Sequence, residues 1–553
     1  MCGLSADTSK VPMIPAALIG TLAISRLGAI HAVVFGGFAP ASLAQRIDAS
    51  KPVAILTASC GIDGAKTPTS YKPFITEAIS LSSHKPEKTI IWQRDQLRWD
   101  NLDKPNGERN WQRLVKSAGS RGIKADCVPV KSSDGIYIIY TSGTTGLPKG
   151  VLREAGGHAV GLHLSISYLF GIHGPGDVMF CASDIGWVVG HSYILYAPLL
   201  TGASTVLFEG KPIGTPDSGT FWRIIEEYKV NTLFTAPTAL RAIRRDDPEN
   251  KMFKTVGERG GLKTLKALFL AGERSEPSII TMYQELLKKY GAPGHVIDNW
   301  WSSESGSPIS GVALVPHAGK DRKTTIRDHE PLGIKPGSAG KAMPGFDVRI
   351  VDDSGKEVEK GKMGNIVLGM PLAPTGFRTL WQDEERFYKG YLKRFEGKWI
   401  DTGDAGMIDE DGYIHVMSRS DDIINVAAHR FSTGKSTLFS PFLPVLIVCR
   451  VHRTSYLLPP HHRRMLRRWR PRRTQRPPPI RLRNSLHSRS PHLRHPLRPT
   501  LRRSTKACPH ANRRHCLSRR HDPRQRHDSK DSLWQDVEEG VERVGGECGA
   551  WRF

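Results

Sequence analysis

The sequence predicts an α/β protein in which helices cover the sheets, followed by a smaller β-rich segment. Between about residues 11 and 430, short β-branched or apolar runs alternate with longer helical patterns, which is typical of sheets packed between helices. Near Gly337 the pattern changes to segments that read as hairpins. With 39% hydrophobic residues in a chain of 553, there is enough apolar material for a large core and two or three domains, which excludes wholesale disorder.

The first part of the chain carries the strand and helix patterns. Apolar or β-branched runs predict strands at residues 29–35, 52–56, 135–140, 203–208, 232–235 and 267–270, and longer patterns predict helices at 221–229 and 277–290. Further on, GFDVRIVDDSGKEVEKGKMGNIVLG and DGYIHVMSR predict hairpins, with a turn at 353–355. We assign residues 11–336 to an α/β core and 337–420 to a β-rich subdomain.

The net charge of +25 comes almost entirely from one segment. Residues 450–526 hold 23 Arg and one Lys against one Asp, so the rest of the chain is close to neutral. This segment is rich in Arg, Pro, His and Ser and cannot bury enough apolar area to offset its ordering entropy. We expect it to be disordered, and we read the remainder as an ordinary soluble protein.

Cysteine usage and hydropathy limit the class of protein further. The eight cysteines form no CxxC pair and no zinc-type spacing, which predicts reduced thiols in an intracellular compartment. No run of 18 apolar residues occurs, so no membrane span is expected. The first ten residues show neither a signal-peptide pattern nor a transit-peptide pattern, and no targeting segment is visible.

The strongest local signal for chemistry is TSGTTGLPKG at residues 141–150, directly after the strand-like GIYIIY. Hydroxyls and backbone N–H groups on a Gly-rich turn suit a polyphosphate, and Lys149 can neutralise its charge. The GxxxxGK[ST] spacing of a Walker A loop is absent. The segment therefore predicts a polyphosphate-binding loop of another kind.

This loop resembles the phosphate loop of the adenylate-forming enzyme superfamily, and further blocks follow in the order that such enzymes show. They are DIGWVVGHSY at 184–193, TAPTALRAI at 235–243, AGER at 271–274, DNWWSSESG at 298–306, DTGD at 401–404 and SRSDDIINVAAHR at 418–430. The double Trp and the GWVVGHSY block are similar to those of AMP-forming short-chain acyl-CoA synthetases, the acetyl-CoA and propionyl-CoA synthetase group. The resemblance covers residues 11–434 and implies the acyl-CoA synthetase-like fold, with a large N-terminal AMP-binding domain.

The resemblance implies a ligase reaction with ATP, Mg²⁺ and coenzyme A. A carboxylate attacks the α-phosphate of ATP to give an acyl-adenylate and pyrophosphate, and the thiol of coenzyme A then displaces AMP. The catalytic residues would be Lys149, Glu304 and Arg430, with Glu304 also binding the metal. The residues that would bind ATP are Thr141, Ser142, Gly143, Thr144, Thr145 and Gly146 in the loop, Gly272, Glu273, Arg274, Asp298, Asn299 and Trp300 around the adenine, and Ser303, Asp404, Arg419 and Arg430 at the ribose and phosphates.

The acyl pocket suggests a short substrate. Trp301 would close the pocket, because an indole there leaves no room for a long chain. Val188 and Val189 follow GW in the sequence. Ala271 stands where acetyl-specific relatives tend to have a Val, and the smaller Ala side chain would make room for about one extra carbon. A methylene is worth only about 1–3 kcal/mol of discrimination. We therefore expect propionate as the preferred substrate, with acetate tolerated and fatty acids excluded.

Residues 421–434 would hold the hinge and the start of the small C-terminal domain. Relatives rotate that domain about a hinge Asp, which corresponds to Asp421, and bring in a Lys from a PKTRSGK motif that this chain lacks. Ala427 and Ala428 fall in the block that lines the coenzyme A tunnel. Ala428 replaces the usual Gly, and its extra methyl group could hinder coenzyme A.

The genetic code offers a source for residues 435–553. Codons for residues 434–436 can contain the splice donor GTAAGT, and codons for 449–450 can contain the splice acceptor TGCAG. The number of nucleotides that splicing would remove between these two sites is not divisible by three, so retaining them shifts the reading frame. Shifting the frame by one nucleotide converts residues 529–550 to PKTRSGKTLRRVLRELVENA, which contains the absent motif. We expect 435–553 to be intron read-through plus frame-shifted exon. We also expect an N-terminal truncation, because the resemblance begins abruptly after a non-family start at 1–10.

Two other functional interpretations remain open. The chain could be an inactive product that at most binds ATP, or, remotely, a nucleic-acid-binding protein that uses its Arg-rich tail. The tail has few aromatic residues on which bases could stack, so we expect no nucleic-acid partner and no membrane partner. The oligomeric state is open, and the expected compartment is the cytoplasm or the mitochondrial matrix.

Overall fold

The computed structural model describes residues 5–8, 12–64, 66–103, 107–141, 147–291, 294–314, 333–419, 423–426 and 429–432, with backbone alone at 5–8 and from 423 onward. These residues belong to one compact unit, Met1–Pro441. Several predicted features lie outside the described residues: the loop residues Ser142, Gly143, Thr144, Thr145 and Gly146, the hinge Asp421, the tunnel residues Ala427 and Ala428, the side chain of Arg430, and the whole segment 433–553.

The first sheet has seven strands within the described residues, in the order β7-β6-β3-β1-β2-β8-β9. All neighbours run parallel except β8 and β9, which form an antiparallel hairpin. The strands are β1 (Ser5–Thr8), β2 (Ile30–Val33), β3 (Ala54–Ala58), β6 (Lys88–Trp92), β7 (Glu108–Asn110), β8 (Gly135–Thr141) and β9 (Lys149–Glu154). The accompanying helices are α1 (Pro15–Arg26), α2 (Pro40–Ser50), α3 (Lys72–Leu81) and α4 (Trp111–Ser120), and β4 (Cys60–Gly61) pairs with β5 (Thr69–Ser70).

The second sheet is wholly parallel, and its five described strands run in the order β11-β10-β12-β13-β14. They are β10 (Val178–Cys181), β11 (Ser204–Thr205), β12 (Thr232–Thr235), β13 (Ala267–Leu270) and β14 (His295–Asp298). The helices of this part are α5 (Ala155–Tyr168), α6 (Val188–Gly190), the π-helix η1 (His191–Tyr196), α7 (Ala197–Leu200), α8 (Thr220–Tyr228), α9 (Pro237–Asp246), α10 (Lys251–Glu258) and α11 (Pro277–Lys289). Every residue of β12 and β13 is buried, as expected of strands covered on both faces.

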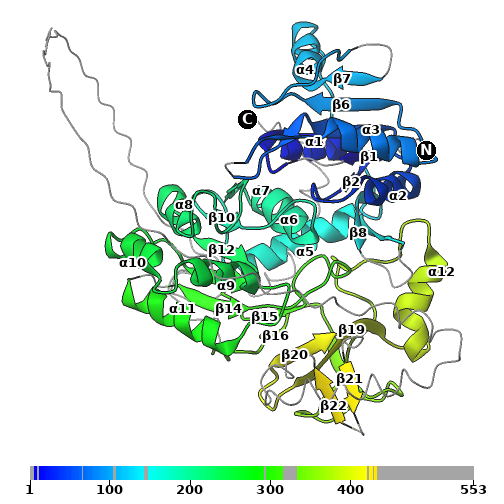
Figure 1. Cartoon of the computed structure of the whole chain (residues 1–553). Helices are drawn as coiled ribbons and strands as arrows, with labels where there is room; N and C mark the ends of the chain where they lie inside the picture. The colour runs from blue at the N-terminus through cyan, green and yellow to red at the C-terminus, as the bar shows by residue number, and fades with distance from the viewer. Residues whose placement is uncertain are drawn as a thin grey trace, which may run out of the picture. The chain divides into compact units, whose positions relative to one another are not determined.

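The third sheet is antiparallel and lies in the yellow-green to yellow part of the chain in Figure 1. In the described residues it contains β17 (Val348–Val351), β18 (Gly364–Leu368), β19 (Ile400–Ile408) and β20 (Ile414–Arg419), each paired with the next. Between β18 and β19 the chain forms α12 (Glu384–Phe387), the π-helix η2 (Tyr388–Leu392) and the 3₁₀-helix η3 (Lys393–Phe395). Two short pairs complete this part: β15 (Ser310–Gly311) with β16 (Lys341–Ala342), and β21 (Ile423–Val426) with β22 (His429–Ser432).

The predicted elements agree with the structure, with one correction. The helices predicted at 221–229 and 277–290 are α8 and α11, and the predicted turn at 353–355 contains Gly355 at φ +80°. The strand predicted at 203–208 is wrong beyond two residues, because β11 pairs with β10 only at Ser204 and Thr205. No helix among the described residues is long and apolar enough to cross a membrane.

One buried cluster joins the three sheets. It includes Tyr137 of the first sheet, Phe234 and Phe269 of the second, and Ile366 and Ile400 of the third. Burying one such side chain contributes about 1.5–3 kcal/mol, so separating the sheets would be costly. This cluster holds the strand ends that carry the predicted site in fixed positions.

Candidate active site

The two ends of the predicted phosphate loop are held together by the β8–β9 hairpin. Thr141, the last residue of β8, pairs with Lys149, the first of β9. Arg386 of α12 donates from Nη2 to the carbonyl of Leu147 at 2.6 Å and from Nη1 to that of Pro148 at 3.2 Å. The Thr141 hydroxyl is buried and has no hydrogen-bond partner among the described residues. The hairpin thus presents a hydroxyl and an ammonium at the base of the loop.

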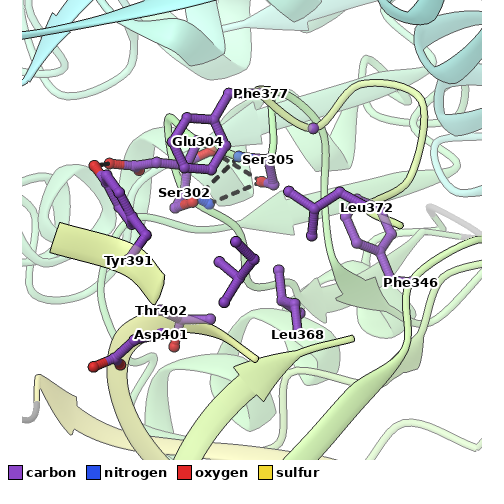
Figure 2. Close-up of a pocket in the computed structure, with 12 residues that line it drawn as sticks. Ser302, Glu304, Ser305, Phe346, Leu368, Leu372, Phe377, Tyr391, Asp401 and Thr402 are labelled. Carbon is purple, nitrogen blue, oxygen red and sulfur yellow. Dashed lines mark hydrogen bonds between the residues drawn. The ribbon is translucent and has the colours of Figure 1, made fainter. Parts of the chain in front are cut away.

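Lys149 and Glu304 meet through a tyrosine. Lys149 Nζ lies 3.9 Å from Glu304 Oε1, and each side chain is about one-fifth exposed, at 21% and 20%. The hydroxyl of Tyr391 accepts from Lys149 Nζ at 2.7 Å and donates to Glu304 Oε1 at 2.5 Å. Figure 2 shows the Tyr391 hydroxyl directed at the Glu304 carboxylate. Two residues predicted to bind phosphate and metal are therefore brought together by one that was not predicted.

The electrostatics of this trio suit an anionic ligand. Burial lowers the pKa of Lys149 because it penalises the ammonium, although Glu304 opposes the shift. Burial and the adjacent Glu304 carboxylate raise the pKa of the Tyr391 hydroxyl, so it keeps its proton for donation. A phosphate beside Lys149 would offset the cost of burying the ammonium, because a nearby opposite charge favours the charged form.

The backbone at Glu304 is held by a buried guanidinium. Arg153 of β9 is 1% exposed and donates to the carbonyls of Ser303 at 2.5 Å and Glu304 at 3.3 Å, and also to that of Thr375. Gly306 lies directly against it: a Cβ there would come within 2.5 Å of Arg153 Cζ. The first sheet thereby fixes the position of the loop that carries Ser303 and Glu304.

The residues predicted to frame adenine follow the carboxyl ends of β13 and β14, where ligands bind in open α/β sheets. Gly272 has φ +99°, and the space that its Cβ would occupy is open. Asn299 donates from Nδ2 to the Leu270 carbonyl at 3.1 Å, while its buried Oδ1 has no partner in the described part of the chain. Burial raises the pKa of Asp298 to about 7. An unfilled space and an unpaired acceptor fit a ring with hydrogen-bond donors.

Glu273 and Arg274 are exposed members of this predicted adenine frame, as is Gly272. Glu273 forms an ion pair with Arg241 of α9 at 2.7 Å. The charge of Arg274 acts on Asp298, where it lowers the pKa against the larger effect of burial. Both side chains are therefore open to solvent at the carboxyl ends of β13 and β14.

The predicted ribose ligand, Asp404, is tied to the predicted adenine frame. Trp300 Nε1 donates to Asp404 Oδ2 at 3.0 Å, and both residues are buried. Arg419 Nη1 lies 3.6 Å from Asp404 Oδ1, and the register of β19 shifts beside this position. The carboxylate is therefore oriented by Trp300, which follows β14 of the second sheet, and by Arg419 of β20 in the third.

The predicted acyl-pocket residues pack against the common core. Ala271 is part of the buried cluster, and Val189 and Trp301 lie against it. The Trp301 ring is 5.6 Å from that of Tyr193 and 6.2 Å from that of Phe234. Val188, at the start of α6, is half-buried. The structure thus holds Trp301 on two aromatic neighbours.

A pocket of about 340 Å³, part of it open to solvent, lies next to Glu304 (Figure 2). Its lining is mostly apolar, with polar groups of Glu304, Tyr391, Asp401 and Thr402 among the side chains. The residues that line it are Ser302, Glu304, Ser305, Phe346, Leu368, Leu372, Gly376, Phe377, Tyr391, Ile400, Asp401 and Thr402. The pocket therefore adjoins both the DNWWSSESG and the DTGD blocks.

His191 lies in a buried aromatic cluster and not in the ligand-facing part of the site. It stacks on His31 with ring centroids 5.4 Å apart and lies 4.5 Å from Tyr137. His158 and Tyr196 complete the cluster. This packing favours a structural role for His191 in the core.

Sequence reasoning missed Tyr391, Arg153 and Arg386. Arg153 follows the recognised loop by three residues, but Tyr391 and Arg386 lie in DEERFYKGYLKRF, which contains no motif. Among the described residues no group of three His, Cys, Asp or Glu side chains could hold a metal ion. A Mg²⁺ bound through Glu304 and phosphate oxygens still fits, because Mg²⁺ is commonly held by one or two carboxylates plus substrate phosphates.

Comparison with known proteins places these features in context. The sequence pattern of a family described as AMP-binding enzyme matches residues 10–377. The human acyl-CoA synthetase short-chain family member 3, mitochondrial, is 45% identical over 424 residues, covering 77% of this chain and 58% of the relative. The propionate–CoA ligase of Salmonella typhimurium is 40% identical over 428 residues, covering 76% and 63% respectively. This chain thus spans about three-fifths of the length of these relatives.

The fold has counterparts among solved structures. Acetoacetyl-CoA synthetase from Streptomyces lividans superimposes with a TM-score of 0.65 at 21% sequence identity, covering 78% of this chain and 61% of that one. At this identity the likeness concerns the fold, which is the α/β fold of adenylate-forming enzymes.

Proposed function

The chain belongs to the AMP-binding enzyme family, and on that premise we propose that it is a short-chain acyl-CoA synthetase that uses ATP to activate propionate, with acetate as a second substrate. The observation that carries this proposal is the approach of Lys149 and Glu304 at the base of the phosphate loop, 3.9 Å apart. A cation and a carboxylate placed there can bind a polyphosphate and its metal ion. The two relatives are an acyl-CoA synthetase and a propionate–CoA ligase by name, which agrees with it.

In the proposed first half-reaction, an oxygen of the substrate carboxylate bonds to the α-phosphorus of ATP, and the bond from that phosphorus to pyrophosphate breaks. Both reactants are anionic, so the site must concentrate positive charge and hydrogen-bond donors. Lys149 and the loop backbone would hold the β- and γ-phosphates, and Ser303 would reach the α-phosphate. Mg²⁺, when bound, neutralises phosphate charge; Glu304 is the residue that would hold it.

In the proposed second half-reaction, the thiol of coenzyme A bonds to the acyl carbon and AMP leaves. Ala427, Ala428 and the hinge Asp421 would serve this step. They lie outside the described residues, as does the side chain of Arg430, so their roles rest on the sequence resemblance.

Substrate size follows from the walls of the acyl pocket. Trp301 is braced by Tyr193 and Phe234, which disfavours a swing of the indole that would admit a long chain. Ala271 is buried and Val189 is half-buried, and a methyl side chain at Ala271 in place of Val would leave room for one carbon beyond acetate. We propose propionate on this basis, in the cytoplasm or the mitochondrial matrix; the human relative is named as mitochondrial.

We also propose that residues 435–553 derive from a retained intron and a shifted reading frame. Sequencing of reverse-transcribed message across the codons for 434–450 should reveal a shorter, spliced form that restores PKTRSGK. A genomic sequence without GTAAGT at this position would contradict the proposal.

The proposed function is tested on the full chain by two assays. Binding of Mg·ATP, measured by calorimetry, should occur in the unaltered chain and weaken in Lys149→Met. Pyrophosphate exchange should be driven by propionate more than by acetate and not by octanoate. Mg·ATP binding without exchange would instead support the alternative that this chain only binds ATP. Absence of both would contradict the proposed function.

A further inference from the structure

We propose that Tyr391 is a positioning residue for nucleotide binding, whose hydroxyl keeps Lys149 and Glu304 apart and aims the Glu304 carboxylate at the metal ion. The inference rests on the proposed function, because it concerns the same phosphate and metal site. Tyr391 belongs to none of the recognised motifs and comes from η2, far along the chain from both partners.

The direction of each hydrogen bond is fixed by chemistry. The ammonium of Lys149 has donors and no lone pair, so at 2.7 Å it must donate to the Tyr391 oxygen. The single phenolic proton of Tyr391 is then available for Glu304 Oε1 at 2.5 Å. Lys149 therefore donates to Tyr391, and Tyr391 donates to Glu304.

Packing holds the phenol in this position. Tyr391 is 6% exposed, and its ring meets those of Phe377 and Phe387 at centroid distances of 4.8 and 5.8 Å. Lys149 Nζ lies 4.6 Å from the centroid of the Tyr391 ring. Phe377 also donates its backbone N–H to the Glu304 carbonyl at 2.9 Å, so Tyr391 and Glu304 share a support. Tyr391 therefore cannot turn away without disturbing its aromatic neighbours.

The Tyr391 hydroxyl prevents a direct hydrogen bond between Lys149 and Glu304. A direct lysine–carboxylate hydrogen bond is about 2.7–2.9 Å long, whereas Lys149 and Glu304 stand 3.9 Å apart with the phenol oxygen between them. Direct pairing would neutralise the two charges that phosphate and metal require. Within the described part of the chain, the interactions of the Glu304 side chain run through Oε1, which leaves Oε2 for a cation.

The test is Tyr391→Phe in the full chain, which keeps the ring and removes only the hydroxyl. Calorimetry should show Mg·ATP binding weakened about tenfold, the scale expected for losing hydrogen bonds to charged groups. AMP binding should change less than about twofold, because AMP brings neither a metal ion nor the phosphates that Lys149 would hold. A double variant with Glu304→Gln should bind Mg·ATP no more weakly than Glu304→Gln alone if Tyr391 acts through Glu304.

The chain offers a matched control in Tyr413. It is also 6% exposed, its hydroxyl donates to the Gly333 carbonyl at 2.6 Å, and Lys335 Nζ lies 4.6 Å from the centroid of its ring. Tyr413→Phe should cost similar thermal stability and leave Mg·ATP affinity unchanged.

The outcomes separate this inference from the proposed function. If the unaltered chain binds Mg·ATP and Tyr391→Phe binds it equally well, the inference is wrong and the proposed function stands. Equal weakening of AMP and Mg·ATP binding would also overturn the inference, because it would indicate a general structural role. If the unaltered chain binds no nucleotide, both are overturned.

Discussion

Trp300 and Asp404 are joined by a hydrogen bond of 3.0 Å from the indole Nε1 to the carboxylate Oδ2. One residue follows the last strand of the parallel second sheet, and the other lies within β19 of the antiparallel sheet. The bond therefore links the predicted adenine frame to the predicted ribose ligand. It also occupies one oxygen of Asp404, so the carboxylate has a fixed orientation before any nucleotide binds.

Trp300→Phe should weaken AMP and ATP binding alike, by about tenfold, because it removes a donor to a buried carboxylate. Calorimetry with both nucleotides measures this. The equal effect on both nucleotides distinguishes Trp300→Phe from Tyr391→Phe, which should weaken Mg·ATP binding much more than AMP binding. Trp99→Phe is the control: its indole donates to the Ser59 carbonyl at 2.6 Å, and its loss should lower stability without changing nucleotide affinity.

Arg153→Met should lower the free energy of unfolding by about 3 kcal/mol, because buried carbonyls at Ser303, Glu304 and Thr375 lose their donor. Urea denaturation measures the loss. Mg·ATP affinity should fall as well, since the Glu304 backbone is released.

The control for Arg153 is Arg94→Met. Arg94 forms two 2.7 Å bonds with Glu209, so its replacement should also cost stability but should leave Mg·ATP affinity unchanged. Unchanged affinity in Arg153→Met would contradict its part in holding Glu304.

Ala271→Val should shift the preference from propionate toward acetate by about tenfold in kcat/KM, because the added methyl groups fill the space of one substrate carbon. Pyrophosphate exchange with each acid measures the shift, and the spliced form of the enzyme should be used if this chain shows no exchange. Ala203→Val is the control, because Ala203 belongs to the same buried cluster but lies directly before β11, outside the predicted site. A similar shift in both variants would indicate general overpacking instead of a pocket wall.

Acid should destabilise the fold through its buried histidines. Burial lowers the pKa of His31 and His158 well below the usual value and that of His191 to about 4. These residues stay neutral in the fold but bind protons in the unfolded chain below about pH 6.5. Their contribution is therefore complete above that pH and is lost as the pH falls toward 4, at up to about 1.4 kcal/mol per pH unit for each histidine.

The histidine effect is measured by urea denaturation between pH 7.5 and about 4.5, with His158→Leu compared to the unaltered chain at each pH. Because His158 is one of three buried histidines, the variant should lose about one-third of their contribution to the slope of the free energy of unfolding against pH. Comparison at each pH is needed because Asp298, with its pKa raised to about 7, destabilises the fold as the pH rises through the same window. His163→Leu, at an exposed position on the same helix α5, should leave the slope unchanged.

The sequence by itself determined the local features of this protein. Alternating apolar runs predicted β12, β13, α8 and α11, because hydrophobic periodicity is set by burial along one element. The short blocks TSGTTGLPKG, DNWWSSESG and DTGD predicted Lys149, Glu304 and Asp404 as site residues, because each block is a short stretch whose backbone shape and side chains act together.

Only the tertiary structure decided how those blocks meet. Tyr391 is 242 residues from Lys149 and 87 from Glu304, Arg153 is 151 from Glu304, and Trp300 is 104 from Asp404. No local pattern marks such partners, since a single tyrosine in a polar helix looks the same whether it faces solvent or a carboxylate. They were selected by the packing of three sheets on one buried cluster, which brings strand ends from distant parts of the chain to a common edge.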